Sequence, residues 1–508
     1  MDSTGGLTQQ RVWLLFAISL GALFVALPSV PRFVVFSPDA WTVYELGRTV
    51  GGDFFRANTV REFVTGSTYS SSFAPLWPVI VSVFSRITGN IYGGYLAAFL
   101  AYAAFAGAAE LFARRAFGQR GIGVLSALLM LQFRGLQEEL SSGRSIPFAL
   151  FVLALLGVLL IGLQAAPVWR SAVVGLLAGA LAMTRFDAMP AALVVVLGAP
   201  LIGLSRARLA MLVAGFAVAV SPWVAYSLTH FHTIFASDNR VVALAVDRMA
   251  FVHDFHVRPQ LTLFDAPWAW LAKVLRNSLT IAHALLRSIR ETLFLPLLLL
   301  LALVHAYRSG TPPTRRELDP RMREIALFTI VAMAPLTGYV ATGYWDHRYF
   351  SAVLWLTELF LLAYVTRRYS RAVVLALALA GSLLSVATLW YATQTSPLSA
   401  MRREIDRTQV DRLEGCLRRA GGTPTDAVVF AGRDVTSRYK FGALTGWRVL
   451  PLPSNWERLG RLERDEFLRR YAAVFVVDSG PSPTIPIALH TKTMECGMPL
   501  QKIARVGP

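Results

Sequence analysis

Residues 12–41 read VWLLFAISLGALFVALPSVPRFVVFSPDAW, and this stretch decides the fold. The run from Val12 to Val30 is apolar and close to the ~20 residues that an α-helix needs to cross a bilayer core. No convincing small-residue cleavage site follows it, so it predicts a retained helix rather than a removed signal peptide. Asp39 stands just beyond this run, at the start of a long polar loop. A carboxylate in that position is hard to explain by packing, and it indicates chemistry at the membrane surface on a lipid-borne substrate.

The composition indicates a chain that crosses a membrane many times. Of its 508 residues, 55% are hydrophobic and only 16% are charged, and the mean hydropathy is +0.51. A soluble protein of this length needs more charge to cover its surface. The net charge of +18 does not indicate a nucleic-acid partner, because much of the basic charge lies in short loops between apolar segments, where the positive-inside rule places it.

Apolar segments predict about 11 transmembrane helices, so the expected fold class is a polytopic α-helical membrane protein. With the N-terminus in the cytoplasm, the short inner loops carry 15 basic residues and the short outer loops carry four, which sets the predicted orientation. If residues 75–88 also crossed, the arginine clusters would face outward, so this segment predicts a helix along the outer interface. The predicted spans are 12–30, 91–112, 121–133, 146–163, 171–184, 188–204, 209–229, 292–307, 325–343, 349–366 and 372–392.

This topology divides the chain into two expected domains. Residues 1–392 form the transmembrane domain, with long outer loops at 31–90 and 230–291, and residues 393–508 form a small extracytoplasmic α/β domain. Loops of this length in a compact bundle are usually functional.

The C-terminal domain has its own pattern of helices and strands. Residues 402–419 and 459–471 predict helices, and 427–431 and 472–478 predict buried strands. The two cysteines, Cys416 and Cys496, both fall in this domain. An oxidising compartment favours a disulfide between them, and two buried thiols are the alternative.

Several acidic residues near the outer surface are candidates for proton transfer or cation binding. Asp39 is the candidate catalytic base, and its alternative role is to cap the helix that begins near Trp41. Glu45 and Asp53 are secondary candidates that also fit solvated loop charges. Glu138 or Glu139 could face Asp39 and help to hold a divalent cation, Mg²⁺ or Mn²⁺, with water; a solvated turn is the alternative. Metal ligands stay unassigned, because the loop histidines lack zinc-protease spacing.

Five cationic side chains at the outer ends of the segments are candidates for binding a lipid phosphate. Arginine forks suit phosphate oxygens, and aromatic neighbours suit headgroup depth. The alternatives are an ion pair between Arg185 and Asp187 and an aromatic belt around a snorkelling Arg348. The candidates are Arg144, Arg185, Lys273, His347 and Arg348.

The order of these motifs resembles the GT-C membrane glycosyltransferases over about residues 10–365. The nearest branch resembles protein O-mannosyltransferases, aminoarabinose transferases and mycobacterial-type arabinofuranosyltransferases. Departures are Ala40 after the first acid, where many relatives have a second acid, the absence of a Lys after the Pro segment, and the absence of a Trp-Trp-Asp signature. The matching stretches are 38–48, 72–78 with 87–89, 113–118, 183–187 and 347–350.

The resemblance implies a transferase that moves a sugar from a polyprenyl-phosphate-linked donor to an acceptor hydroxyl of a cell-envelope glycan, lipid or protein. The expected location is the outer face of a bacterial cytoplasmic membrane. Asp39 would deprotonate the acceptor, and Arg144, Arg348 and Arg185 would stabilise the leaving phosphate. The alternatives are a lipid or sugar transporter or flippase, a polymer ligase of the O-antigen type, and a membrane scaffold with a periplasmic binding domain. Transport predicts repeated halves and broken, charged helices, which this sequence lacks.

Overall fold

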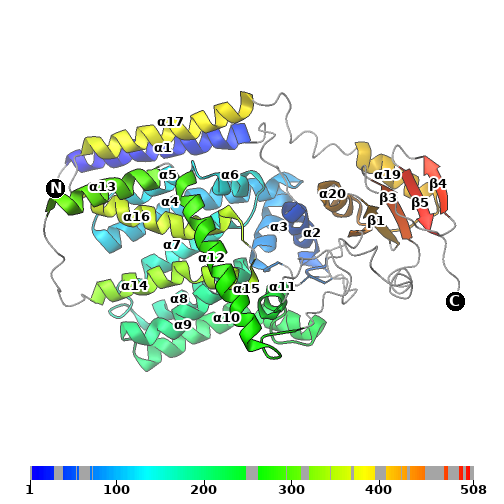
Figure 1. Cartoon of the computed structure of the whole chain (residues 1–508), viewed down its shortest axis with the longest axis horizontal. Helices are drawn as coiled ribbons and strands as arrows, with labels where there is room; N and C mark the ends of the chain where they lie inside the picture. Colours follow the sequence, from blue (N-terminus) through cyan, green and yellow to red (C-terminus); the bar gives the residue numbers. More distant parts are fainter. Residues whose placement is uncertain are drawn as a thin grey trace.

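A computed structural model gives the fold of the chain as a helical bundle with a small sheet beyond one of its ends (Figure 1). The descriptions below are limited to the parts of the chain that the structure describes. These are residues 3–27, 38–52, 54–56, 69–70, 73–246, 261–292, 294–309, 320–343, 345–367, 371–394, 408–424, 426–431, 435–451, 474–478, 491–495 and 499–503.

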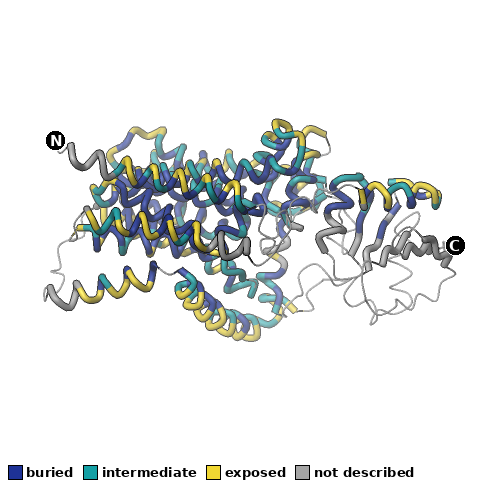
Figure 2. The backbone as a smooth tube through the Cα atoms, turned by 90° about the horizontal axis from the view of Figure 1, so that it is seen from above, coloured by how far each residue is buried: buried dark blue, intermediate teal, exposed yellow. Residues whose placement is uncertain are grey.

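The bundle consists of apolar helices that run mostly along the long axis of the molecule (Figure 1). Apolar segments become helices in a bilayer because a helix satisfies its own backbone hydrogen bonds. Figure 2 shows that their inner faces are buried and many of their outer faces are exposed. The bundle helices are α1 (Ser3–Ala26), α4 (Tyr92–Phe117), α5 (Ile122–Met130), α7 (Ile146–Leu160), α8 (Val168–Thr184), α9 (Met189–Gly198) with η4 (Ala199–Ile202), α10 (Arg206–Phe231), α13 (Phe294–Ser309), α14 (Pro320–Met333), α15 (Pro335–Thr342), α16 (Ser351–Thr366) and α17 (Arg371–Gln394).

The predicted spans correspond to these helices, but the count of about 11 crossings stays a prediction. Within the described residues, five helices are long and apolar enough to cross a membrane. The count rises to six if α6 (Arg134–Ser141) and α7, which are bent by 112°, form one broken span. Five more apolar helices are shorter than this length test requires.

The remaining helices lie at the end of the bundle nearest the sheet or, in the case of α12, across its side (Figure 1). Residues 75–88 form a helix as expected, and it packs against the helices before and after it. The sequence interpretation treated α6 as a turn and α12 as part of a loop, and the structure corrects both. These elements are α2 (Pro38–Arg48), η2 (Thr49–Gly51), α3 (Leu76–Thr88), η3 (Phe186–Ala188), α11 (Asp238–Leu244), α12 (Pro267–Glu291) and η5 (His347–Phe350).

The C-terminal region contains a five-stranded mixed sheet in the order β2-β1-β3-β5-β4. The first three strands are parallel, and β5 is antiparallel to both β3 and β4. Helices α19 and α20 pack on this unit around buried Val428 and Trp447. The elements are α19 (Thr408–Arg419), β1 (Ala427–Ala431), α20 (Val435–Thr445), β2 (Arg448–Pro451), β3 (Val474–Asp478), β4 (Thr491–Glu495) and β5 (Pro499–Ile503).

Cys416 lies on the buried face of α19, with 2% of its surface exposed. It is disulfide-bonded in the structure, and Cys496 lies outside the described residues. The predicted helix at 459–471 also lies outside them.

Helix α20 joins the C-terminal region to the helix that carries Asp39. The guanidinium Nη1 of Arg48, the last residue of α2, donates a hydrogen bond of 2.8 Å to the carbonyl oxygen of Ala443 near the end of α20. Ala443 is buried in the same apolar core as the bundle helices. A cation at a helix C-terminus is favourable because the last carbonyls lack partners within the helix.

We expect Arg48→Met to loosen this contact. Losing a charge-assisted bond at a partly exposed site costs about 1 kcal/mol, which corresponds to roughly fivefold faster opening. Limited proteolysis should therefore cut the C-terminal region roughly fivefold faster in the variant. Arg418→Met is the matched control, because Arg418 pairs with Glu414 on the exposed face of α19. Equal cutting rates for Arg48→Met and the wild-type protein would contradict the prediction.

Candidate functional site

Three separate elements bring one carboxylate and two guanidinium groups together at one end of the bundle. Asp39 comes from the first turn of α2, Arg144 from the turn between α6 and α7, and Arg348 from η5. Oδ2 of Asp39 lies 3.7 Å from Nη2 of Arg348 and 4.0 Å from Nε of Arg144. These three residues were separate predictions from the sequence, and the structure places them in one cluster.

Glu139 forms the buried floor of this cluster. Its side chain is 0% exposed, and its Oε1 lies 3.4 Å from Nε of Arg348 and 3.5 Å from Nη1 of Arg144. Its Oε2 accepts the backbone N–H of Ile146, the first residue of α7, at 3.2 Å. Asp39 is 34% exposed, so it is the carboxylate that faces incoming molecules. We call Asp39, Glu139, Arg144 and Arg348 the carboxylate–arginine cluster.

Two glycines let the backbone bring these side chains together. A Cβ on Gly135 of α6 would lie 2.6 Å from the Cα of Arg348, so only glycine lets α6 approach η5 this closely. Gly143 has φ +63°, a left-handed conformation that favours glycine, and it reverses the chain between α6 and α7. Pro147 in the first turn of α7 then starts the next helix. Arg144 lies in the turn that results.

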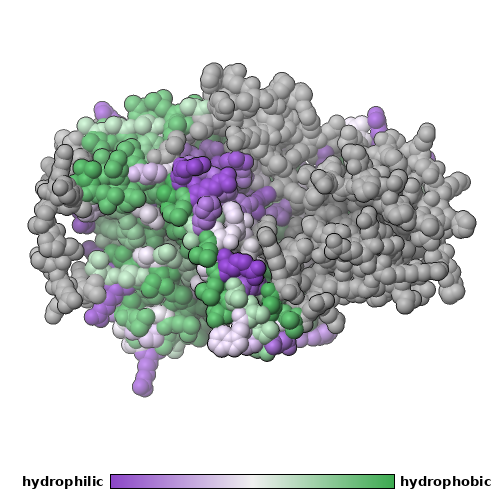
Figure 3. Space-filling view, in the orientation of Figure 1, coloured by the Kyte–Doolittle hydropathy of each residue, from purple (hydrophilic) through white to green (hydrophobic). Residues whose placement is uncertain are grey.

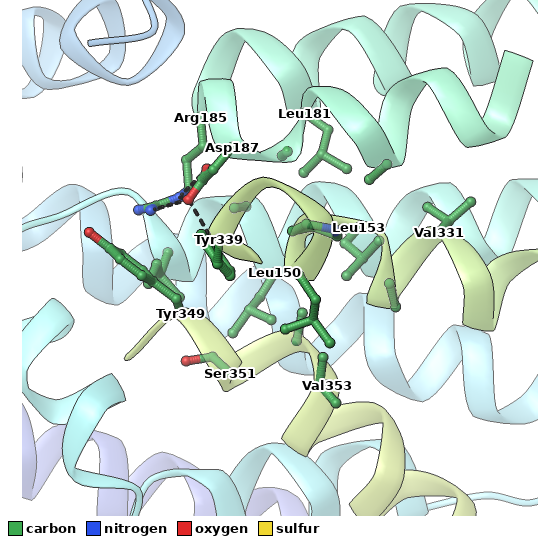
Figure 4. Close-up of a pocket in the computed structure, with 18 of the residues that line it drawn as sticks. Leu150, Leu153, Leu181, Arg185, Asp187, Val331, Tyr339, Tyr349, Ser351 and Val353 are labelled. Atoms are coloured by element: carbon green, nitrogen blue, oxygen red, sulfur yellow. Dashed lines mark hydrogen bonds and ion pairs between the residues drawn. The ribbon is translucent and has the colours of Figure 1, made fainter. Parts of the chain in front are cut away.

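A second polar group consists of Arg185, Asp187 and Tyr339 (Figure 4). Nη2 of Arg185 pairs with Oδ2 of Asp187 at 2.7 Å, and the hydroxyl of Tyr339 donates to the same oxygen at 2.8 Å. Burial alone would lower the pKa of Arg185, but Asp187 together with Tyr339 and Tyr349 outweighs burial and raises that pKa above its usual range. The ion pair with Asp187 was the alternative interpretation of Arg185, and the structure contains it.

The aromatic ring of Tyr349 connects the two groups. The guanidinium carbons of Arg185 and Arg348 lie 4.9 and 5.0 Å from its centroid, which is cation–π range. Nη2 of Arg348 also donates to its hydroxyl at 3.2 Å. Tyr339 stacks on the ring at 5.0 Å between centroids. Two cations are thereby held on one aromatic side chain.

An apolar groove opens beside these cations. Its empty space, including its opening to the outside, is about 540 Å³. Figure 4 shows Arg185, Asp187, Tyr339 and Tyr349 at one end and aliphatic side chains along the rest. The lining residues are Ile146, Ala149, Leu150, Leu153, Leu181, Arg185, Asp187, Ala188, Ala191, Val331, Ala332, Pro335, Leu336, Tyr339, Arg348, Tyr349, Ser351, Ala352 and Val353. We call this cavity the apolar groove.

Asp346 is a further acidic residue beside Arg348, and the sequence interpretation gave it no role. Its Oδ2 lies 3.4 Å from Nε of Arg348, and its Oδ1 accepts the N–H of Arg348 at 3.4 Å. Burial raises the pKa of the Asp346 carboxyl, although the hydrogen bond from that N–H opposes the rise. The signal in the sequence was its place two residues before Arg348.

Two predicted phosphate-binding residues have other partners in the structure. The ammonium Nζ of Lys273 is buried and donates to the carbonyl oxygens of Val242 and Ala245 at 2.9 and 2.6 Å. It therefore anchors α12 to α11, and we leave it out of the site. Nδ1 of His347 lies 2.9 Å from Oγ of Ser288 and 3.8 Å from Oε2 of Glu291.

The structure gives the secondary acidic candidates different surroundings. Glu45 is 4% exposed on α2, so it is not the solvated loop charge that the sequence suggested as an alternative. Glu138 pairs with Nε of Arg134 at 2.9 Å on the more exposed side of α6. Asp53 lies outside the described residues. Of the three that the structure describes, Glu139 alone belongs to the carboxylate–arginine cluster.

The cluster does not fit a divalent cation held between Asp39 and Glu139. Both carboxylates face the guanidinium groups of Arg144 and Arg348, and a cation placed between them would meet two positive charges at short range. Within the described residues, no group of three or more His, Cys, Asp or Glu side chains could hold a metal ion. The Mg²⁺ or Mn²⁺ suggestion is therefore not carried further.

Comparisons with solved structures identify the fold. The chain is similar to ArnT from Cupriavidus metallidurans bound to undecaprenyl phosphate, with a TM-score of 0.60, 13% identity and 100% of each chain covered. It is also similar to the oligosaccharyltransferase AglB from Archaeoglobus fulgidus in complex with an inhibitory peptide and a dolichol-phosphate, with a TM-score of 0.53, 14% identity, and 93% of this chain and 69% of that chain covered. No family model and no curated protein matches the sequence.

The protein therefore shares its fold with ArnT and AglB, both of which are GT-C superfamily members. At 13–14% identity the likeness establishes the fold, and it confirms the resemblance inferred from the motif order. The apolar helices and this fold make the protein membrane-embedded. Figure 3 shows a surface that suits a bilayer, with hydrophobic side chains over much of the described bundle face and a hydrophilic patch in the region of α12.

Proposed function

We propose that the protein is a glycosyltransferase that moves a sugar from a polyprenyl-phosphate-linked donor to an acceptor hydroxyl. One observation supports this proposal above the others. Asp39, a partly exposed carboxylate, lies 3.7 Å from Arg348, and Arg348 also lines one end of the apolar groove. A candidate base, a phosphate-binding cation and a channel for a hydrocarbon chain are therefore adjacent.

The proposed donor site uses the polar end of the apolar groove for the phosphate and its aliphatic part for the hydrocarbon chain. The phosphate of the carrier lipid binds Arg348 and Arg185, whose planar forks suit phosphate oxygens. The polyprenyl chain lies along Leu150, Leu153 and Val331, and burying its methylene groups adds about 0.8 kcal/mol for each one. Tyr349 holds the two guanidinium groups in place before the donor binds, which reduces the entropy lost on binding.

The proposed reaction is a direct displacement at the anomeric carbon of the sugar. Asp39 takes the proton of the acceptor hydroxyl as that oxygen forms the new glycosidic bond. The bond between the anomeric carbon and the phosphate oxygen breaks, and its electron pair leaves with the phosphate. Arg348, Arg144 and Arg185 stabilise the negative charge on the leaving phosphate, so no acid is needed to protonate it. Attack from the face opposite the phosphate inverts the anomeric configuration.

We assign this reaction to the outer face of a bacterial cytoplasmic membrane, with a cytoplasmic N-terminus and residues 393–508 outside. The acceptor in this proposal is a hydroxyl of a cell-envelope glycan, lipid or protein. The arginine-rich inner loops counted in the sequence support the orientation. The contact between Arg48 and Ala443 supports placing the C-terminal region on the side of Asp39.

The direct test is turnover by the purified protein in lipid nanodiscs with a panel of radiolabelled polyprenyl-phosphate sugars. We expect at least one donor to lose its sugar to a hydroxyl-bearing acceptor, and mass spectrometry identifies the product. Flipping of a labelled lipid across vesicles without any sugar release from the whole panel would favour transport and reject the proposal.

Filling the apolar groove should weaken the use of donors with a long prenyl chain more than the use of donors with a short one. Ala352→Phe adds a ring to the groove wall, so we expect roughly tenfold weaker use of an undecaprenyl-linked donor, equal to about 1.4 kcal/mol of lost tail contact. A donor with a short prenyl chain should react as it does with the wild-type protein. Leu197→Phe is the control, because Leu197 is 74% exposed on the outside of α9. An equal loss with both donors would mean that the tail does not occupy this groove.

A further inference from the structure

Three arginines from three helices converge on the C-terminal end of α7, one helix length from the carboxylate–arginine cluster. Helix α7 starts at Ile146 beside Glu139 and runs about 22 Å to Leu160. Arg115 and Arg170 donate to backbone carbonyl oxygens at or just beyond that end, and Arg208 donates to one in the connection from α7 to α8. The bonds are Arg115 Nη1 to Val158 at 2.7 Å, Arg170 Nη2 to Val158 at 3.1 Å and to Ile161 at 2.9 Å, and Arg208 Nη2 to Ala166 at 2.8 Å.

Within the part of the chain that the structure describes, these bonds leave positive charge that is only partly balanced. The nitrogens of Arg115 and Arg170 lie within about 6 Å of each other because both bind the carbonyl oxygen of Val158. The carboxylate that acts on Arg170 is Glu324, which is buried and accepts the N–H of Gly162 at 2.7 Å. Among the described residues, these three guanidinium groups and the Glu324 carboxylate sum to two positive charges. Like charges this close repel unless an anion joins them.

The donor groups of the arginines are also incompletely used. A guanidinium has five N–H donors, and the bonds to carbonyl oxygens use one or two of them. Among the described residues, Nε of Arg170 and Nε of Arg208 are buried and meet no acceptor. Capping the end of α7 therefore explains only part of this cluster.

The surroundings of the arginines face lipid. Leu111 precedes Arg115 by four residues on α4, and Met211 follows Arg208 by three on α10, so each pair shares a helix face. Leu111 is 48% exposed, Met211 39%, and Trp169, next to Arg170, 62%. Exposed apolar side chains beside arginines, with a tryptophan, are typical of headgroup depth in a bilayer.

We infer that Arg115, Arg170 and Arg208 form a binding site for the phosphate of an anionic phospholipid at the end of the bundle opposite Asp39. Arginine forks bind two phosphate oxygens at once, and basic sites between membrane helices suit anionic headgroups. The acyl chains lie along Leu111 and Met211, and this contact distinguishes a phospholipid from free phosphate. The site is separate from the proposed transfer reaction.

The test measures lipid binding by native mass spectrometry of the full-length protein. We expect phosphatidylglycerol to bind the wild-type protein more tightly than phosphatidylcholine, and R115Q/R170Q to bind it about tenfold or more weakly. R206Q is the matched control, because Arg206 is exposed on α10 near Arg208 and makes none of these bonds. R170K keeps the positive charge but loses the planar guanidinium, so it should bind phosphatidylglycerol with intermediate affinity. This conservative variant keeps the test informative if R115Q/R170Q misfolds.

Three results would overturn the inference. The first is equal phosphatidylglycerol affinity in R115Q/R170Q and the wild-type protein. The second is an equal loss in R206Q, which would mean that net charge alone attracts the lipid. The third is displacement of phosphatidylglycerol by millimolar inorganic phosphate, which would mean that the acyl chains add nothing.

Discussion

Asp39→Asn should stop sugar transfer and leave the fold intact. The amide keeps the shape of the side chain but cannot accept the acceptor proton, so we expect turnover to fall by roughly 10²–10⁴-fold. The ion pairs of Asp39 are 3.7 and 4.0 Å long at a partly exposed site, so their loss should cost about 0–1 kcal/mol of stability. Turnover with a saturating lipid-linked donor and the thermal unfolding midpoint are the two measurements.

The readouts for Asp39→Asn separate catalysis from donor binding. Donor affinity, measured by native mass spectrometry, should stay within about threefold of the wild-type value, because Arg348 and Arg185 remain. Glu414→Gln, a change of the same kind on α19, should leave both turnover and affinity unchanged, because Glu414 contacts only Arg418 among the ion pairs of the described residues. Half or more of the wild-type turnover in Asp39→Asn would remove Asp39 as the base.

Arg348→Met should destabilise the protein as well as stop transfer. Arg348 is 8% exposed and faces Glu139 at 3.4 Å, and Glu139 is 0% exposed. Removing the cation leaves a buried carboxylate with less compensation, and breaking such a pair typically costs about 3–5 kcal/mol. The unfolding midpoint in detergent should therefore fall clearly below that of the wild-type protein. Arg134→Met is the control, because its pair with Glu138 is exposed and is worth less than ~1 kcal/mol.

A double variant tests the reason for that loss. Glu139→Gln combined with Arg348→Met removes both charges, so the unfolding midpoint should return most of the way to the wild-type value. Transfer should stay absent, because the donor phosphate still lacks Arg348. If the double variant is as unstable as the single one, then Arg348 stabilises the fold through packing and not by balancing Glu139.

The sequence was informative about elements whose signal is local. Long apolar segments predict helices such as α4, α10 and α16 within a few residues, because hydropathy alone marks them. Asp39, Arg144 and Arg348 were found as polar residues at the ends of apolar segments. Their contact with one another depends on close packing at Gly135, which a single sequence does not reveal.

The parts that sequence analysis missed depend on tertiary contacts. The apolar groove is lined from several helices, so no single segment carries its pattern. Lys273 had the charge of a phosphate ligand, but it donates to the carbonyl oxygens of Val242 in α11 and of Ala245 just after it, and such acceptors have no sequence signature. Helix α12 is an exception, because its signal was local and was missed: Leu271, Leu275, Leu279 and Leu286 are spaced four or seven residues apart, which is the period of an amphipathic helix.

The two ends of α2 have different partners. Asp39 lies at one end, and Arg48 at the other binds Ala443, 395 residues away along the chain. A rigid helix of 11 residues transmits a tilt from one end to the other. Remodelling the C-terminal region would thus reorient the Asp39 carboxylate, the proposed base, without altering the apolar groove. In the proposed transferase, changes in the C-terminal region would then alter the preference for the acceptor. Changes in the apolar groove would independently alter the preference for the carrier lipid.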